Sequence, residues 1–301
     1  MISCIVCSHN DFFFHQLCEN IKKTIGVPYE IIKIENLNKS RGICAAYNKG
    51  AVQSLYPYLC FVHEDVLFET KNWGKNACSH FENDSSLGLI GIAGCKVKSE
   101  IISTWYRSGK YEFILNRYNY RQSTKDDLSK STLMNLNPLN ETISQVVCLD
   151  GVFLFTSRKV WQMIKFDESL LNHFHGYDLD FSIAATQKFK VAVVYDILLT
   201  HFSEGNLDKI WVQEAFKVHK KWKNYLPISI DKISDLNEQH INNISSFNYF
   251  MNLIRKTKGT LWLRVKMIIF FLPILNKNIP AKSKTRIVLL KIYKELLTSK
   301  I

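Results

Sequence analysis

The sequence predicts an α/β protein with a mainly parallel central sheet and helices on both of its faces. Short apolar runs rich in β-forming residues alternate with segments of helical spacing. Hydrophobic residues make up 47% of the 301 residues, which is enough for one large core. Only 12 Gly and 6 Pro are present, too few for a low-complexity chain.

The expected elements follow one another in a regular order. Strands are expected at Ile2–Ser8, Tyr29–Ile34, Tyr58–Val62, Leu87–Ala93, Val146–Thr156 and Val191–Tyr195. Helices are expected at Phe12–Ile25, at Gly42–Leu55 and at Phe181–Phe189. We therefore divide the chain into a catalytic domain at 1–225 and a basic, amphipathic helical tail at 226–301.

The segment 99–145 is less regular and is rich in Tyr, Trp and Arg. Long insertions of this kind are often functional loops. It is either a loop that covers a donor or contacts a polyhydroxylated acceptor, or an ordinary excursion over the surface.

The net charge of +12 belongs mainly to the tail. From Phe250 onward twelve Lys and Arg face one acid, Glu295, which leaves 27 basic against 26 acidic residues before it. The apolar run Met267–Leu275 is far shorter than the roughly 20 residues that span a bilayer. The tail is either an interfacial helix on a membrane surface or a helix packed on the protein or on a second subunit. A neutral catalytic domain argues against nucleic acid as a partner.

The N-terminus has no basic region followed by a small-residue cleavage site, so no signal peptide is expected. The eight cysteines are scattered through apolar segments, which is typical of reduced core cysteines. We expect a cytoplasmic protein.

Polar residues follow three of the predicted strands. They are Ser8, His9 and Asn10, then Glu35 and Asn36, then His63, Glu64 and Asp65. In open α/β sheets, ligands bind beyond the carboxyl ends of the strands, so these residues should line one crevice. Two neighbouring acids at such an edge favour a divalent cation, although strand ends often carry acids without one.

A second polar cluster spans Phe174 to Asp180, and His201 follows the last predicted strand. Acids in the first turn of a helix are favoured by its dipole, which accounts for one of Asp178 and Asp180, by preference Asp180 as a cap. With His173 just before this segment, two acids and two histidines lie within eight residues, which exceeds what a cap requires. A single histidine such as His201 is more often structural, but it becomes a metal-ligand candidate beside Asp65.

Seven short motifs in this order resemble inverting family 2 glycosyltransferases, and more closely the glycosyltransferase-like family of streptomycin-type biosynthesis clusters. They cover about residues 1–225. They are Ile5-Val-Cys-Ser-His-Asn, Ala46-Tyr-Asn-Lys-Gly, Phe61-Val-His-Glu-Asp-Val, Gly91-Ile-Ala-Gly, Leu149-Asp-Gly-Val-Phe, Phe174-His-Gly-Tyr-Asp-Leu-Asp and His201-Phe-Ser-Glu-Gly.

The resemblance implies a GT-A fold, with a Rossmann-like sheet, and a role for each matched residue. Asp65 matches the last acid of the DxD motif and His201 a late metal-binding histidine. Asp178 matches the catalytic base. His63 replaces the first acid of the DxD motif and Tyr177 the acid before the base. The residues expected to bind the donor are Ser8, His9, Asn10, Glu35, Asn36, Asn48, His63, Glu64 and Asp150; for Asp150 a plain turn role is equally open.

The implied function is transfer of a sugar from a nucleotide-diphosphate sugar, UDP-linked by preference, to a hydroxyl acceptor with inversion, aided by Mn²⁺ or Mg²⁺. The acceptor would be a glycan or a lipid-linked saccharide. Three alternatives stay open: a metal-dependent hydrolase, a nucleotidyltransferase, and an inactive sugar-nucleotide-binding or scaffold protein, which His63 keeps in play. A nucleotidyltransferase is disfavoured because no Gly-rich phosphate loop follows the first strand.

Overall fold

The computed structural model describes residues 1–37, 41–106, 112–124, 130–203, 205 and 207–230, and then 243, 246, 247, 249–254, 256 and 261–275. The chain divides into two compact units. Unit 1 comprises Met1–Lys98, Thr104–Gly205 and Ile228–Asp231. Unit 2 comprises Ser99–Ser103, Asn206–Pro227 and Lys232–Ile301. The predicted domain boundary at residue 225 stays a prediction.

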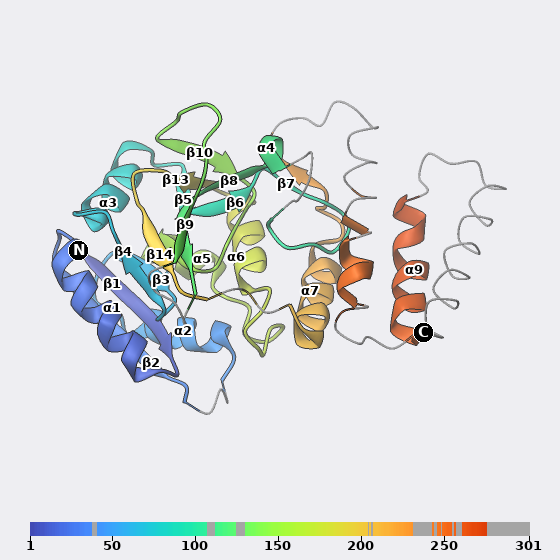
Figure 1. The fold of residues 1–301 in the computed structure, drawn as a ribbon, viewed down its shortest axis with the longest axis horizontal. Coiled ribbons are helices and arrows are strands. Elements are labelled where there is room, and N and C mark those ends of the chain that lie inside the picture. The colour runs from blue at the N-terminus through green and yellow to red at the C-terminus, as the bar shows by residue number, and fades with distance from the viewer. Residues whose placement is uncertain are drawn as a thin grey trace. The chain divides into compact units, whose positions relative to one another are not determined.

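Among the described residues, unit 1 contains a seven-stranded sheet in the order β10-β13-β5-β12-β3-β1-β2 (Figure 1). The strands are β1 (Ile2–Ser8), β2 (Tyr29–Glu35), β3 (Tyr58–Val62), β5 (Leu87–Gly91), β10 (Ile143–Val146), β12 (Phe153–Ser157) and β13 (Lys190–Val194). β2, β1, β3, β5 and β13 run in one direction, while β12 and β10 run against it. The predicted α/β class with a mainly parallel sheet is confirmed.

A second sheet in unit 1 has the order β11-β6-β8-β14-β4, with β9 paired to β8, in the described part of the chain. Its strands are β4 (Val66–Phe68), β6 (Ala93–Cys95), β8 (Asn116–Ser123), β9 (Ser131–Leu136), β11 (Cys148–Leu149) and β14 (Leu199–His201). A separate short pair joins β7 (Val97–Lys98) to β15 (Ile228–Ser229). Since β3 ends at Val62 and β4 begins at Val66, residues 63–65 connect the two sheets.

Helices cover both faces of the large sheet. Because successive side chains along a strand point to opposite faces, each face presents its own apolar side chains to these helices. On one face Ile2, Cys4 and Val6 of β1 join the core with side chains of α1 (Asp11–Thr24) and α3 (Trp73–Asn83). On the other face Phe61 of β3 packs against aromatic side chains of α2 (Ile43–Gln53), of α6 (Tyr177–Thr186) and of the loop between α5 (Arg158–Ile164) and α6.

The segment 143–157, predicted as one strand from Val146 to Thr156, forms three. β10, β11 and β12 belong to two different sheets, and the chain turns at Asp150 and Gly151 between β11 and β12. Asp150 stabilises this turn because its Oδ1 accepts the N–H of Val152 at 2.9 Å. The continuous apolar sequence concealed the break, so the single-strand prediction was wrong. Leu87–Ala93 likewise divides, at Ile92, into β5 and β6.

Two further predictions are corrected. The segment 99–145 contributes β8 and β9 rather than an irregular loop, together with the short helix α4 (Glu112–Leu115). Helix α6 begins at Tyr177, four residues before the predicted start, and its N-cap is Gly176 in a left-handed conformation with φ of 75°. Asp178 and Asp180 therefore lie within the first turn, and Asp180 is not the cap.

Unit 2 has its own apolar cluster, which is built from Ile101, Ile102 and side chains of α7 (Lys209–Trp222), of α9 (Leu261–Leu275) and of the segment between them, where Phe247, Phe250, Met251, Leu253 and Ile254 contribute. Pro273 lies inside α9. Of the helices that the structure describes, none is both long and apolar enough to cross a membrane. All of the predicted basic tail beyond residue 275 lies outside the described residues.

Phe153 tests the core of unit 1. Its fully buried ring contacts Phe68, Trp73 and Phe155. We expect Phe153→Ala to lower the free energy of unfolding by about 3–5 kcal/mol, because a buried aromatic ring leaves a cavity. Chemical denaturation followed by circular dichroism measures the change. Val52→Ala, on the exposed face of α2, should change it by less than about 0.5 kcal/mol; equal losses in the two variants would contradict the assigned core.

Candidate active site

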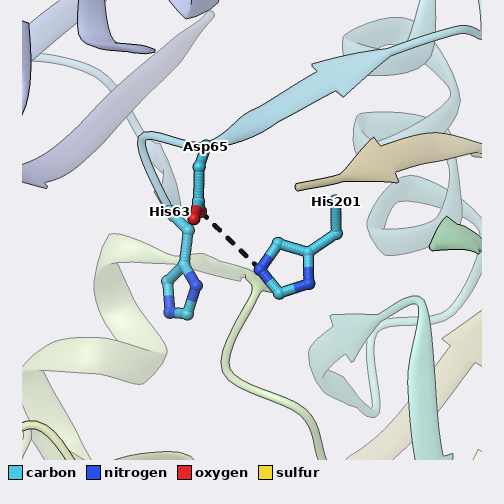
Figure 2. A group of neighbouring side chains, drawn as sticks. All are labelled: His63, Asp65 and His201. Carbon is cyan, nitrogen blue, oxygen red and sulfur yellow. Dashed lines mark ion pairs between the residues drawn. The ribbon is translucent and has the colours of Figure 1, made fainter. Parts of the chain in front are cut away.

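The site begins with the antiparallel pairing of β4 and β14. The register places His201 opposite Val66, next to Asp65, although the two segments are distant in sequence. The backbone N–H of Phe202 donates to the carbonyl of Asp65 at 3.0 Å and continues this pairing. As a result, His201 Nε2 lies 3.6 Å from Asp65 Oδ1 (Figure 2). Ser203 Oγ lies 3.1 Å from the same ring nitrogen.

His63 enters the site from the other end of the connection between the sheets. Its backbone N–H donates to Val152 O at 3.1 Å, which fixes the residue beside the β11–β12 turn. Its Nε2 lies 2.7 Å from the hydroxyl of Tyr177, at the start of α6. The His63 and His201 rings are 5.7 Å apart, between centroids.

His63, Asp65 and His201 each offer one ligand atom, and these atoms lie within 4.8 Å of one another. Figure 2 shows the three side chains converging from the β3–β4 connection and from β14. Asp65 is buried and the two histidines are half-buried. Two imidazoles and a carboxylate are a donor set that suits a divalent transition ion. The arrangement therefore fits a metal ion.

Glu64 points away from these three residues and holds the loop after β1. Its Oε2 accepts the backbone N–H groups of His9 and Asn10, both at 3.1 Å, and its Oε1 lies 2.8 Å from His9 Nδ1. The carboxylate is buried. Asn10 then caps α1, because its Oδ1 accepts the N–H of Phe12 at 3.0 Å. Ser8, the last residue of β1, is fully buried.

Asp178 carries a strongly shifted pKa. Desolvation of this half-buried carboxyl and, to a smaller extent, the negative charge of Asp150 together raise its pKa to about 7. The backbone N–H of Leu179, 2.9 Å from Oδ1, and the positive charge of Lys98 oppose the shift. A carboxyl group that titrates near neutral pH can exchange protons with a substrate hydroxyl.

Three further residues predicted to bind the donor, Glu35, Asn36 and Asn48, make contacts with other parts of unit 1. Glu35 ends β2 and is exposed, 3.5 Å from Lys33 Nζ. Asn36 is buried and exchanges hydrogen bonds with the backbone of Arg41, at 2.7 and 3.1 Å. Asn48 uses its amide within the core: it donates to Phe166 O and accepts from Phe166 N and Trp161 Nε1. Its polar atoms therefore anchor the loop before α6.

Three residues beside the site received no individual role in the sequence analysis, although one of them lies in the aromatic segment singled out there. Trp105 donates its indole N–H to Asp150, which brings the aromatic segment to the β11–β12 turn. Buried Lys98 acts on Asp178 through its charge. Tyr177 was noted only as a departure from the family pattern. The aromatic richness of 99–145 pointed to Trp105, whereas a lone lysine and a helix-start tyrosine carry no comparable signal.

Comparisons with known proteins identify the family and the fold. A family model described as "Glycosyltransferase like family" matches residues 3–229. The comparison with curated proteins finds no match.

Among solved structures, the chain is similar to GalNAc-T7 crystallised with UDP, GalNAc and Mn²⁺, with a TM-score of 0.52 and 14% identity. That match covers 85% of this chain and 56% of GalNAc-T7. It shows the GT-A fold, as the sequence predicted. A197 from STIV is also similar, with a TM-score of 0.36, 12% identity and coverage of 67% and 86%.

Glu64 provides a test of the loop after β1. We expect Glu64→Gln to lower the free energy of unfolding by about 1–3 kcal/mol, since an amide cannot accept all the hydrogen bonds that the buried carboxylate accepts. Thermal and urea denaturation measure the change. Glu35→Gln is the matched control, because Glu35 ends the neighbouring strand but is exposed. A Glu64→Gln protein as stable as the control would show that Glu64 does not hold the loop.

Proposed function

The chain belongs to the glycosyltransferase-like family, and we propose that it transfers a sugar from a nucleotide-diphosphate donor to a hydroxyl acceptor with inversion. The single observation that carries the proposal is the placement of a carboxyl group with a pKa near 7, Asp178, in the same unit as the convergent group His63, Asp65 and His201. One group suits proton abstraction and the other suits a diphosphate-binding cation.

The proposed donor is a nucleotide-diphosphate sugar, with UDP-sugars first. The support is the family and the UDP named for GalNAc-T7, a protein of the same fold. His63, Asp65 and His201 would hold Mn²⁺ in preference to Mg²⁺, because two imidazoles favour the transition ion. Such an ion supplies positive charge that neutralises the diphosphate leaving group. Ser8, His9, Asn10, Glu35, Asn36 and Glu64 would line the nucleotide side of the crevice.

Asp178 would act as the general base. It removes the proton of the acceptor hydroxyl as that oxygen bonds to the anomeric carbon, while the bond from that carbon to the diphosphate breaks. A base on the face opposite the leaving group produces inversion in a single displacement. Asp150 would keep the pKa of Asp178 near neutral and, through Trp105, orient the aromatic segment beside the sugar.

The finer assignments rest on the resemblance. We propose a streptomycin-type member of inverting family 2, with a glycan or lipid-linked saccharide as acceptor. The basic tail would bring the protein to the inner surface of the cell membrane or take part in a homo-oligomer. The family and acceptor assignments come from motifs within residues 1–225, whereas the membrane and oligomer assignments concern the tail, whose residues beyond 275 lie outside the described part of the chain.

A donor panel separates the proposed enzyme from an inactive binding protein. We expect UDP-, GDP- or dTDP-sugars to raise the melting temperature in the presence of Mn²⁺, and one of them to release its nucleoside diphosphate faster when an acceptor is added. Acceptor-independent release would instead indicate a hydrolase. Binding without any release of nucleoside diphosphate would favour the inactive sugar-nucleotide-binding protein. If no donor changes the melting temperature, the protein does not bind a nucleotide sugar and the proposal is wrong.

The pH profile of transfer tests the base. We expect kcat/KM to rise with pH and to level off above a pKa of about 7, because Asp178 must lose its proton before it can accept one. Asp178→Asn should reduce kcat at least ~100-fold and leave donor binding within about threefold. Full activity in this variant would reject the assignment. Glu168→Gln, a change of an exposed carboxyl before α6, should keep the wild-type profile.

The shifted pKa of Asp178 also predicts a pH-dependent change in the stability of the protein without substrate. The pKa of Asp178 is raised from 3.8 to about 7 on folding, so between these values the folded state binds more protons than the unfolded state. The ionised carboxyl therefore costs stability as the pH rises from 4 to 7, and the cost is complete above pH 7. We expect Asp178→Asn to melt higher than wild type at pH 8, with the difference shrinking at pH 4. An equal difference at both pH values would contradict the shifted pKa.

A further inference from the structure

The hydroxyl of Tyr177 is held beside His63 by packing that leaves it little freedom. The Tyr177 side chain is buried, and its ring meets those of Tyr47 and Phe166 at centroid distances of 5.8 and 6.3 Å. On its other side the hydroxyl lies directly over Gly151, where a Cβ would collide with the Tyr177 hydroxyl and ring. The position of the hydroxyl is therefore set by the aromatic core and by the β11–β12 turn.

The hydrogen bond to this hydroxyl occupies Nε2 of His63 and leaves Nδ1 as the nitrogen that can face an ion. A neutral imidazole has one N–H and one lone pair. Nε2 of His63 lies 2.7 Å from the Tyr177 hydroxyl, so Nδ1 is the nitrogen left to face Asp65 and His201. When Nε2 carries the proton and donates to Tyr177, Nδ1 has its lone pair available. The opposite tautomer would place an N–H at Nδ1 and remove a ligand.

We propose that Tyr177 is a positioning residue that holds His63 in the Nε2–H tautomer and so presents Nδ1 to a divalent ion bound by Asp65 and His201. Partners of this kind fix the tautomer and ring orientation of metal-binding histidines, and their loss commonly weakens affinity 10- to 100-fold. The inference depends on the proposed function only in expecting a divalent ion.

The test compares two buried tyrosines on the full-length protein. Tyr177→Phe removes the hydroxyl and retains the ring, and we expect it to weaken Mn²⁺ binding about 10-fold or more in calorimetric titration. Tyr47→Phe is the matched control. Tyr47 is buried against Tyr177, and its hydroxyl has no hydrogen-bond partner among the described residues, so its loss should change Mn²⁺ affinity less than twofold.

Equal Mn²⁺ affinity in wild type and Tyr177→Phe would overturn the proposal, as would a wild-type protein that binds none of Mn²⁺, Co²⁺ and Zn²⁺. A Co²⁺ absorption spectrum adds a second readout, because loss of one nitrogen ligand alters its d–d bands. If Tyr177→Phe loses metal binding but the wild-type protein transfers no sugar, the proposed function is wrong and this inference stands. If the wild-type protein transfers sugar but Tyr177→Phe binds metal as the wild type does, the proposed function stands and this inference is wrong.

A measurement on the wild-type protein tests the proposal even if Tyr177→Phe does not fold. Nitrogen-15 spectra of the metal-free protein at pH 8, with the His63 signal assigned from its absence in His63→Gln, distinguish the two neutral tautomers. We expect His63 to carry its proton on Nε2. A proton on Nδ1 would overturn the proposal whatever the variant shows.

Discussion

The arrangement of the site depends on the antiparallel pairing of β4 with β14. β4 follows β3 after three residues, so this pairing ties the end of the large sheet to the second sheet. It also sets His201 beside Asp65 without any local sequence relation between them. Because neighbouring strands hold their residues in register, the placement comes from backbone hydrogen bonds rather than from attraction between the two side chains.

The side chains of the three residues between the sheets point in two directions and have different roles. His63 and Asp65 face His201, whereas Glu64 faces the backbone of His9 and Asn10. The sequence presents two adjacent acids, and like charges so close would ordinarily resist burial. The structure separates them, since one carboxylate is satisfied by main-chain N–H groups and the other lies between histidines. The middle residue thus organises the first loop, and the outer two join His201 in the group proposed to bind an ion.

The sequence predicted the parts of this architecture that depend on local patterns. Apolar runs marked β1, β2, β3 and β13, and helical spacing marked α1 and α2, each to within a few residues. The polar residues after β1, β2 and β3 were correctly expected at strand ends. Prediction failed where pattern and structure diverge: the apolar segment around Asp150 concealed a turn, and the Tyr-rich strand β8 resembled a loop.

The contacts that tune the site could not be predicted, because they join distant segments. The charge of Asp150, in a turn, raises the pKa of Asp178, at a helix start, and Trp105 reaches Asp150 from a third segment. His63 and Tyr177, the two positions that depart from the family pattern, proved to be in contact. The roles of Asp65, His201 and Asp178 remain predictions, now with a defined geometry.

The short connection 63–65 has a consequence for how this site can vary among related proteins. Adding or deleting one residue there would shift β4 by one position against β14 and turn every β4 side chain to the opposite face. A substitution at position 63 leaves that register intact. Natural variation at this connection should therefore change the chemistry of its side chains far more readily than its length, and new ion preferences can arise there by point mutation alone.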